Sequence, residues 1–168
     1  MGRRHLGWQT NWSVTVWRPS CKMTMARIVL DTNSLIMCVP RRSRYHDLWL
    51  SFLDGRNQLC VTTDILNEYA EKLEQKASAA FAERLLHVIL NCKNILLITP
   101  YYHFAVITED PDDNKFVDCA VAANASCIVT EDRHYRVLKE IGFPHVEVLS
   151  IDEAMILLTR LIGSEKKD

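Results

Sequence analysis

Short apolar runs alternate with longer amphipathic stretches along most of this chain. The first run, Ile28 to Leu30, has no polar alternation, as a strand buried on both faces of a parallel sheet would have. Four later runs are also of strand length. The five predicted strands cover residues 28–30, 59–61, 95–98, 127–130 and 146–149.

Between these strands, apolar residues recur at helical spacing. A short helix follows the first strand and ends at Pro40. Ser150 and Glu153 have the spacing of a capping box, and Gly163 is expected to stop the last helix. The remaining helices are predicted at residues 43–54, 65–73, 78–90, 116–125, 135–141 and 151–162. Strands that alternate with helices predict an α/β fold, here a three-layer α/β/α sandwich around a mostly parallel sheet.

The length of 168 residues is that of one domain, which the pattern places at residues 25–162 and follows with a polar tail at 163–168. Residues 1–24 show neither periodicity nor the apolar core of a signal peptide, so they are predicted to be an N-terminal extension outside the core. Three of the four tryptophans lie there, which leaves a partner-binding arm open. No apolar run reaches transmembrane length, so no membrane partner is expected.

Charge and cysteine usage narrow the picture further. A net charge of −1 gives no overall attraction to nucleic acid, so a polyanion would be held by local basic groups or metal ions. The six cysteines are scattered without a C-x-x-C pair, as small buried hydrophobes of a reducing cytosol would be, and a cytoplasmic protein is predicted. Arg41, Arg42 and Arg44 form a basic cluster that is either a solvated loop or an RNA-binding set of phosphate contacts.

Acidic residues stand where open α/β sheets form their ligand crevice, beyond the carboxyl ends of the strands. Asp31 and Asp132 each follow a strand, Glu68 lies early in a helix after the second strand, and Asp113 opens another helix. Asp31 alone could equally be a helix cap. Four carboxylates in one cleft repel one another unless cations neutralise them, and hard oxygen ligands favour Mg²⁺ or Mn²⁺. Such a cleft suits phosphodiester hydrolysis, and no Gly-rich phosphate loop, G-x-S-x-G or H-E-x-x-H motif competes with it.

From about Met25 to Leu158 the chain resembles the PIN domain, specifically the bacterial group of toxin components of toxin-antitoxin systems. The resemblance rests on Ile-Val-Leu-Asp31-Thr-Asn33, Glu68, Asp-Pro-Asp-Asp113-Asn-Lys-Phe and Ile-Val-Thr130-Glu-Asp132, in that order. It implies a Mg²⁺- or Mn²⁺-dependent endoribonuclease that cleaves single-stranded RNA. It also implies a cognate antitoxin protein as partner, and a homodimer or higher oligomer is compatible with it.

The resemblance carries roles over to single residues. The metal-binding catalytic acids would be Asp31, Glu68, Asp113 and Asp132. Supporting roles would fall to Asn33, Thr130, Asn114 and Asp118, the first two through hydrogen bonds.

Three acids complicate this assignment. Glu131 replaces the glycine or basic residue of many relatives, so a further acid would crowd the last strand end. Asp112 adjoins Asp113, which is preferred because the small-residue helix and Thr130 then fall at the family's usual separation. Asp118 is turned well away from Asp113 on a helix, and a role as a helix-surface acid is equally open.

Two other functions are compatible with parts of the sequence. One is a catalytically silent RNA- or protein-binding module that retains the PIN fold, favoured if metal does not occupy the cleft. The other is a phosphoacceptor regulator that uses Asp31. That regulator would need a lysine at a late strand end, and none follows Thr130, so it ranks last.

Overall fold

The structure is a computed structural model that describes residues 25–164, with side chains up to residue 157. The predicted extension at residues 1–24 lies outside the described residues, as does most of the predicted tail.

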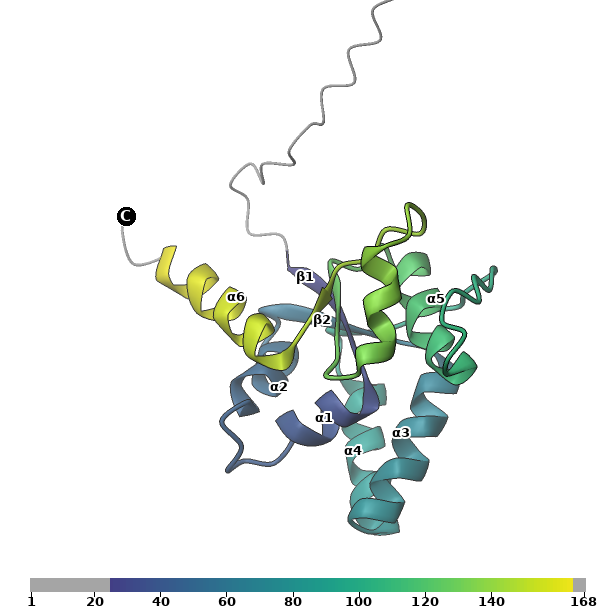
Figure 1. Ribbon diagram of the computed structural model, residues 1–168. Coiled ribbons are helices and arrows are strands. Elements are labelled where there is room, and N and C mark those ends of the chain that lie inside the picture. The colour runs from purple at the N-terminus through teal and green to yellow at the C-terminus, as the bar shows by residue number, and fades with distance from the viewer. Residues whose placement is uncertain (1–24, 165–168) are drawn as a thin grey trace, which may run out of the picture.

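Five strands form one sheet in the order β3-β2-β1-β4-β5 (Figure 1). All four strand pairs are parallel, with Ile28 opposite both Leu59 and Cys127. The prediction of a mostly parallel sheet is therefore confirmed. The strands are β1 (Ala26–Leu30), β2 (Asn57–Val61), β3 (Ile95–Leu97), β4 (Cys127–Val129) and β5 (Val148–Leu149).

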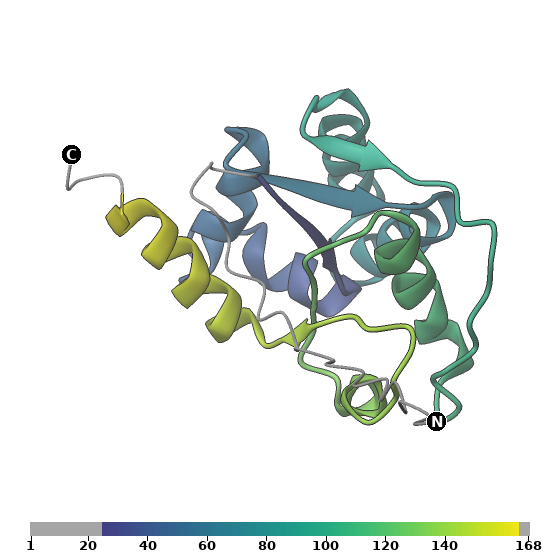
Figure 2. The same ribbon diagram turned by 90° about the horizontal axis from the view of Figure 1, so that it is seen from above.

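Helices cover both faces of the sheet and confirm the layered α/β fold (Figure 1). Helix α5 packs on β1, β2 and β4, α2 packs on β2, and α3 and α4 pack on each other. Helix α6 follows β5 and projects from that edge of the molecule (Figure 2). The α-helices are α1 (Thr32–Cys38), α2 (His46–Leu53), α3 (Thr63–Lys76), α4 (Ala79–Asn91), α5 (Asn114–Ala122) and α6 (Ile151–Ser164). Two 3₁₀ helices are η1 (Pro111–Asp113) and η2 (Arg133–Lys139).

Side-chain caps fix where several helices begin. The Thr62 hydroxyl accepts a hydrogen bond of 3.2 Å from the Ile65 amide at the start of α3. The predicted capping box is confirmed, because the Ser150 amide donates to Glu153 at 2.8 Å and the Glu153 amide donates to Ser150 Oγ at 3.2 Å. Helix α6 nevertheless continues through Gly163, which does not stop it.

The helices predicted at 65–73 and 116–125 both begin two residues earlier than expected, and two further predictions, at 135–141 and 43–54, are also corrected by the structure. The helix expected at 135–141 is the 3₁₀ helix η2 and begins at Arg133, because the Asp132 carboxylate accepts a hydrogen bond from the His134 amide and starts the turn earlier. Helix α2 begins at His46 rather than near Ser43, because residues 40–46 form successive turns in which the Ser43 and His46 amides bond to carbonyls three residues before them.

The core lies between the sheet and its helices. Val29, Leu30 and Ile128 of the central strands are fully buried. The cysteines Cys38, Cys60, Cys119 and Cys127 are buried free thiols, as predicted, whereas Cys92 is half-buried and Cys21 lies outside the described residues. Burial raises the pKa of the Cys60 thiol to about 11, so it stays protonated at neutral pH. Within residues 25–164, no helix is both long and apolar enough to span a bilayer.

Candidate functional site

The strand order reverses between β1 and β4, since β2 and β3 continue the sheet on one side and β5 on the other. Open parallel sheets form a crevice at such a switch point, beyond the carboxyl ends of the two strands. Asp31 follows β1 directly, and Thr130 to Asp132 follow β4. The Asp31 amide donates to the Val129 carbonyl at 3.0 Å, which holds the two strand ends together. The fold therefore places acids from distant parts of the chain at one edge.

Asp31 is buried at the carboxyl end of β1. It occupies the N-cap position of α1, but its carboxylate makes no capping hydrogen bond, so the capping interpretation is wrong for its side chain. Thr130 donates its hydroxyl to Asp31 Oδ2 at 3.2 Å. Burial raises the pKa of Asp31 to about 6; the Thr130 hydrogen bond opposes this rise, and the charges of Asp113 and Glu68 add to it. The carboxylate is therefore available to bind a ligand, and burial makes its charged form unfavourable.

Glu68 reaches the same edge from α3. The Thr32 hydroxyl donates to Glu68 Oε1 at 2.5 Å, and Lys115 Nζ lies 2.7 Å from Glu68 Oε2. Lys115 also pairs with Asp112 at 2.5 Å. Both Glu68 and Lys115 are mostly buried. The carboxylate is therefore oriented by a hydroxyl from α1 and an ammonium from α5.

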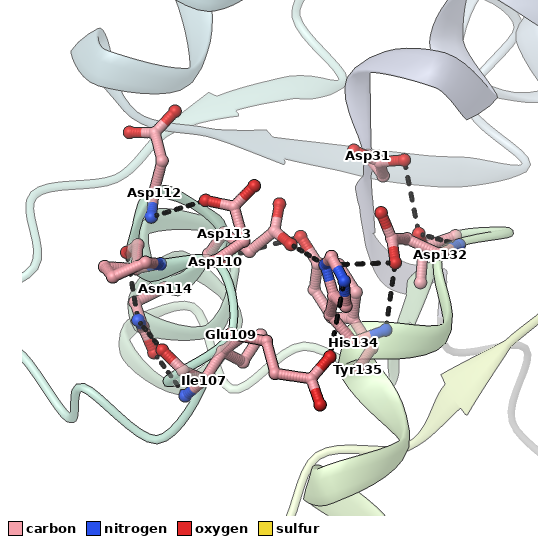
Figure 3. Close-up of polar contacts among 12 residues, drawn as sticks. Asp31, Ile107, Glu109, Asp110, Asp112, Asp113, Asn114, Asp132, His134 and Tyr135 are labelled. Atoms are coloured by element: carbon pink, nitrogen blue, oxygen red, sulfur yellow. Dashed lines mark hydrogen bonds and ion pairs between the residues drawn. The ribbon is translucent and has the colours of Figure 1, made fainter.

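Asp113 ends η1 and faces the end of β4 (Figure 3). Burial raises its pKa to about 6, and the charges of Asp110 and Asp132 contribute. Its Oδ2 atom is buried and has no hydrogen-bond partner among the described residues. A buried carboxylate oxygen without a partner is unfavourable, so this atom fits a cation better than it fits the protein alone.

His134 joins this group from η2. Its Nδ1 lies 3.3 Å from Asp132 Oδ1 and 3.5 Å from Asp113 Oδ2 (Figure 3). Asp110, Asp113 and His134 offer ligand atoms that all lie within 4.8 Å of one another. Within the described residues, Asp113 is the one predicted acid that belongs to this group; its other two members, a histidine and a further aspartate, were not singled out by the sequence.

The neighbouring acids are used differently. Asp112 is exposed and paired with Lys115, so Asp113 is the member of the pair that faces the crevice. Glu131 is turned towards α6, where its Oε1 accepts a hydrogen bond of 2.8 Å from the Ile151 amide. The extra acid of the last strand end therefore caps a helix instead of crowding the crevice.

Asn114 and Asp118 both hold the long segment between β3 and η1. The Asn114 amide group bonds to both the amide and the carbonyl of Ile107, at 2.9 and 2.8 Å. The Asp118 carboxylate accepts from the Phe104 amide at 2.9 Å and contacts His103 Nδ1 at 2.7 Å. Its side chain is only 4% exposed, so the interpretation of Asp118 as a helix-surface acid is wrong.

Asn33 and the arginines lie apart from the acids. Asn33 is exposed and accepts a hydrogen bond of 3.1 Å from Lys76 Nζ. Arg44 pairs with Asp152 of α6 at 2.9 Å, while Arg41 and Arg42 are exposed. The arginines follow α1, whose seven residues place them about 10 Å from its Asp31 end. Within residues 25–164, none of the three arginines makes an ion pair with the acids at the strand ends.

Lys115, His134 and Asp110 are the residues that the sequence did not single out. Lys115 stands in the quoted Asp-Asn-Lys-Phe segment, and His134 stands two residues after Asp132. Only that proximity to predicted acids could have signalled them, because lysine and histidine at such positions are more often solvated.

The sequence profile of the PIN domain matches residues 27–134, well over half of the chain. Among solved structures, the fold is similar to VapBC2 from Rickettsia felis bound to a DNA fragment from its promoter. That match has a TM-score of 0.53 and 18% identity and covers 74% of this chain and 98% of that one. DNA-bound VapBC from Salmonella typhimurium matches with a TM-score of 0.48 and 14% identity, covering 76% and 99%. The PIN domain of T. brucei RRP44 matches with a TM-score of 0.47 and 13% identity, and the match covers 83% of this chain and 84% of that one. No curated protein matches the sequence.

Proposed function

We propose that this chain, which belongs to the PIN domain family, is a metal-dependent endoribonuclease that hydrolyses phosphodiester bonds of single-stranded RNA. The observation that supports the proposal is the position of Asp31 and Asp132 after the two strands at which the sheet order reverses, with the charges of Asp113 and Glu68 close enough to raise the pKa of Asp31. Two of these acids, Asp31 and Asp113, have a pKa raised to about 6. Buried acids of this kind cluster where a protein uses them.

A divalent cation fits this residue set. The oxygens of Asp31, Glu68, Asp113 and Asp132 would hold Mg²⁺ or Mn²⁺, and the unpartnered Asp113 Oδ2 is the clearest vacant ligand. The chemistry supplied by such a cation is activation of water for attack and neutralisation of charge on the leaving oxygen.

The surrounding residues orient the acids. Thr130 bonds to the Asp31 carboxylate and accepts a hydrogen bond of 3.0 Å from the Asp132 amide, so one hydroxyl fixes two of them. Thr32 and Lys115 fix the two oxygens of Glu68. Partners of this kind lower the cost of bringing like charges together and keep each ligand in one orientation.

We further propose a toxin role in the cytoplasm, with a cognate antitoxin protein as partner. The motif resemblance to the bacterial toxin group supports it, and the fold similarity to VapBC2 of R. felis is compatible with it. Growth arrest on expression, relieved by the product of an adjacent small reading frame, is the expected result. If cells that express the active protein continue to grow, the toxin role is contradicted while the nuclease assignment is unaffected.

The nuclease assignment is tested with the purified protein and an end-labelled single-stranded RNA. Cleavage is expected in Mg²⁺ or Mn²⁺, with 5′ phosphate and 3′ hydroxyl products, and EDTA should stop it. Asp31→Asn keeps the side-chain shape but removes a ligand charge, so the rate should fall by orders of magnitude. Cleavage that persists in EDTA, or an Asp31→Asn protein as active as the parent, would overturn the proposal.

A silent binding module is the second candidate, and Lys115 favours it. Its ammonium already neutralises Glu68 from within the protein, at 2.7 Å, as a metal ion would. On this alternative the protein binds RNA without cleaving it, and Mn²⁺ titration shows no binding. Saturable Mn²⁺ binding would reject the alternative.

A further inference from the structure

The ring of His134 stands between acids of three segments, Glu109, Asp113 and Asp132. The turn of η2 fixes its backbone, since the His134 amide donates to Asp132 Oδ1 at 2.9 Å. Its Nδ1 faces Asp113 and Asp132, and its Nε2 lies 3.4 Å from Glu109 Oε2 (Figure 3). Three quarters of the side chain is buried. The ring is therefore held in place and presents one nitrogen to the crevice.

The separations from Nδ1 differ from those of hydrogen bonds. Hydrogen bonds from N–H to oxygen are about 2.7–3.2 Å long. The two contacts of Nδ1 measure 3.3 and 3.5 Å, and both Nδ1 and Asp113 Oδ2 are buried without a hydrogen-bond partner among the described residues. Ligand atoms about 2.1 Å from an octahedral ion lie about 3 Å apart when adjacent and about 4 Å apart when opposite. The 3.5 Å separation of Nδ1 from Asp113 Oδ2 falls between these values.

Glu109 supplies the second half of a familiar arrangement. A metal-binding histidine usually directs its other ring nitrogen at a carboxylate, which selects the tautomer and orients the ring. Glu109 Oε2 lies on the Nε2 side of the ring at 3.4 Å, a charge contact longer than a hydrogen bond. With the proton on Nε2, the Nδ1 lone pair points to Asp113 and Asp132.

We infer that His134 Nδ1 is a metal ligand together with Asp110 and Asp113, so that the site has a nitrogen ligand besides its carboxylates. This inference rests on the proposed metal-dependent function. Imidazole suits transition metals better than Mg²⁺, whereas carboxylates suit Mg²⁺ and Mn²⁺ alike. The nitrogen therefore biases the site towards Mn²⁺ over Mg²⁺.

Two measurements test the inference. Calorimetry measures the affinity of the protein for Mn²⁺, and electron spin echo envelope modulation of the bound Mn²⁺ detects a nitrogen ligand. The expected spectrum of the parent protein contains ¹⁴N modulation, which ¹⁵N labelling of histidine replaces with the ¹⁵N pattern. That labelling needs no variant. His134→Gln should lose the modulation and bind Mn²⁺ at least about tenfold more weakly, with a smaller loss for Mg²⁺. The exposed His87→Gln on α4 is the matched control and should keep both properties.

Each outcome separates the inference from the proposed function. Mn²⁺ bound without nitrogen modulation, or modulation that survives in His134→Gln, would overturn His134 as a ligand and leave the metal-dependent nuclease standing. Absence of any Mn²⁺ binding would overturn both.

Discussion

The hydroxyl of Thr130 donates a hydrogen bond of 3.2 Å to the carboxylate of Asp31, although the two residues stand 99 positions apart in the sequence. The bond joins the ends of β4 and β1, the strands between which the sheet reverses its order. The same hydroxyl accepts from the Asp132 amide. One small side chain therefore sets the relative position of two candidate ligands.

Thr130→Val should show what this link contributes. Valine fills the same space but leaves the Asp31 carboxylate and the Asp132 amide without their partner, which costs about 1–3 kcal/mol of stability. The Thr130 hydrogen bond stabilises the charged form of Asp31, so its loss should raise the pKa of Asp31 further. RNA cleavage should fall about 10–100-fold, as for other residues that orient a ligand. Thr108→Val, at an exposed position, is the control; equal activity of the two variants would refute the role.

The acid cluster should make the metal-free protein less stable as pH rises. Burial raises the pKa of Asp31 from 3.8 to about 6. The unfolded chain therefore loses this proton first, and stability falls between about pH 4 and pH 6 and stays low above. Asp31→Asn should raise the free energy of unfolding at pH 7 by about 1–3 kcal/mol and leave it nearly unchanged below pH 4. Denaturant titration of the parent and Asp31→Asn at both pH values measures this difference. If the substitution destabilises the protein equally at both, the raised pKa of Asp31 is contradicted.

Asp118 should control the order of the segment between β3 and η1. Its carboxylate binds the Phe104 amide, so Asp118→Ala should release this segment and expose the already accessible Tyr101 and Tyr102 to chymotrypsin. Asp118→Asn keeps an acceptor for Phe104 and should remain resistant. Identical digestion of the alanine variant and the parent would show that the contact is dispensable.

The arginines of the basic cluster should contribute unequally to RNA binding. Arg44 already pairs with Asp152, whereas Arg42 is exposed and makes no ion pair with the described side chains. Arg42→Ala should weaken binding and reduce the slope of log affinity against log salt by about 0.7, the value of one phosphate contact on single-stranded nucleic acid. Arg44→Ala should change the slope less. Equal slopes for the parent and Arg42→Ala would remove this arginine from the interface.

Much of this architecture could be predicted because strands and acids leave strong local signals. Uninterrupted apolar runs such as Ile28 to Leu30 mark buried parallel strands, and an acid after such a run marks the edge where ligands bind. Ser150 and Glu153 fixed the start of α6 by spacing alone. These features depend on a few neighbouring residues.

The direction of charged side chains could not be predicted, because it depends on partners far away in the chain. Glu131 follows the same strand as Asp132 but turns to the α6 amide. Lys115 reaches Glu68 from another helix, and His134 meets Asp113 only through the turn of η2. No local pattern distinguishes such contacts from solvent exposure.

The most direct test of the central claim compares two adjacent acids. Asp113 faces the crevice with a buried oxygen that has no hydrogen-bond partner among the described residues, whereas Asp112 is exposed and paired with Lys115. The measurement is the single-turnover rate of single-stranded RNA cleavage in saturating Mn²⁺ for Asp113→Asn and Asp112→Asn. The account predicts that Asp113→Asn loses activity by orders of magnitude while Asp112→Asn stays near the parent rate. Equal rates for the two variants would contradict it.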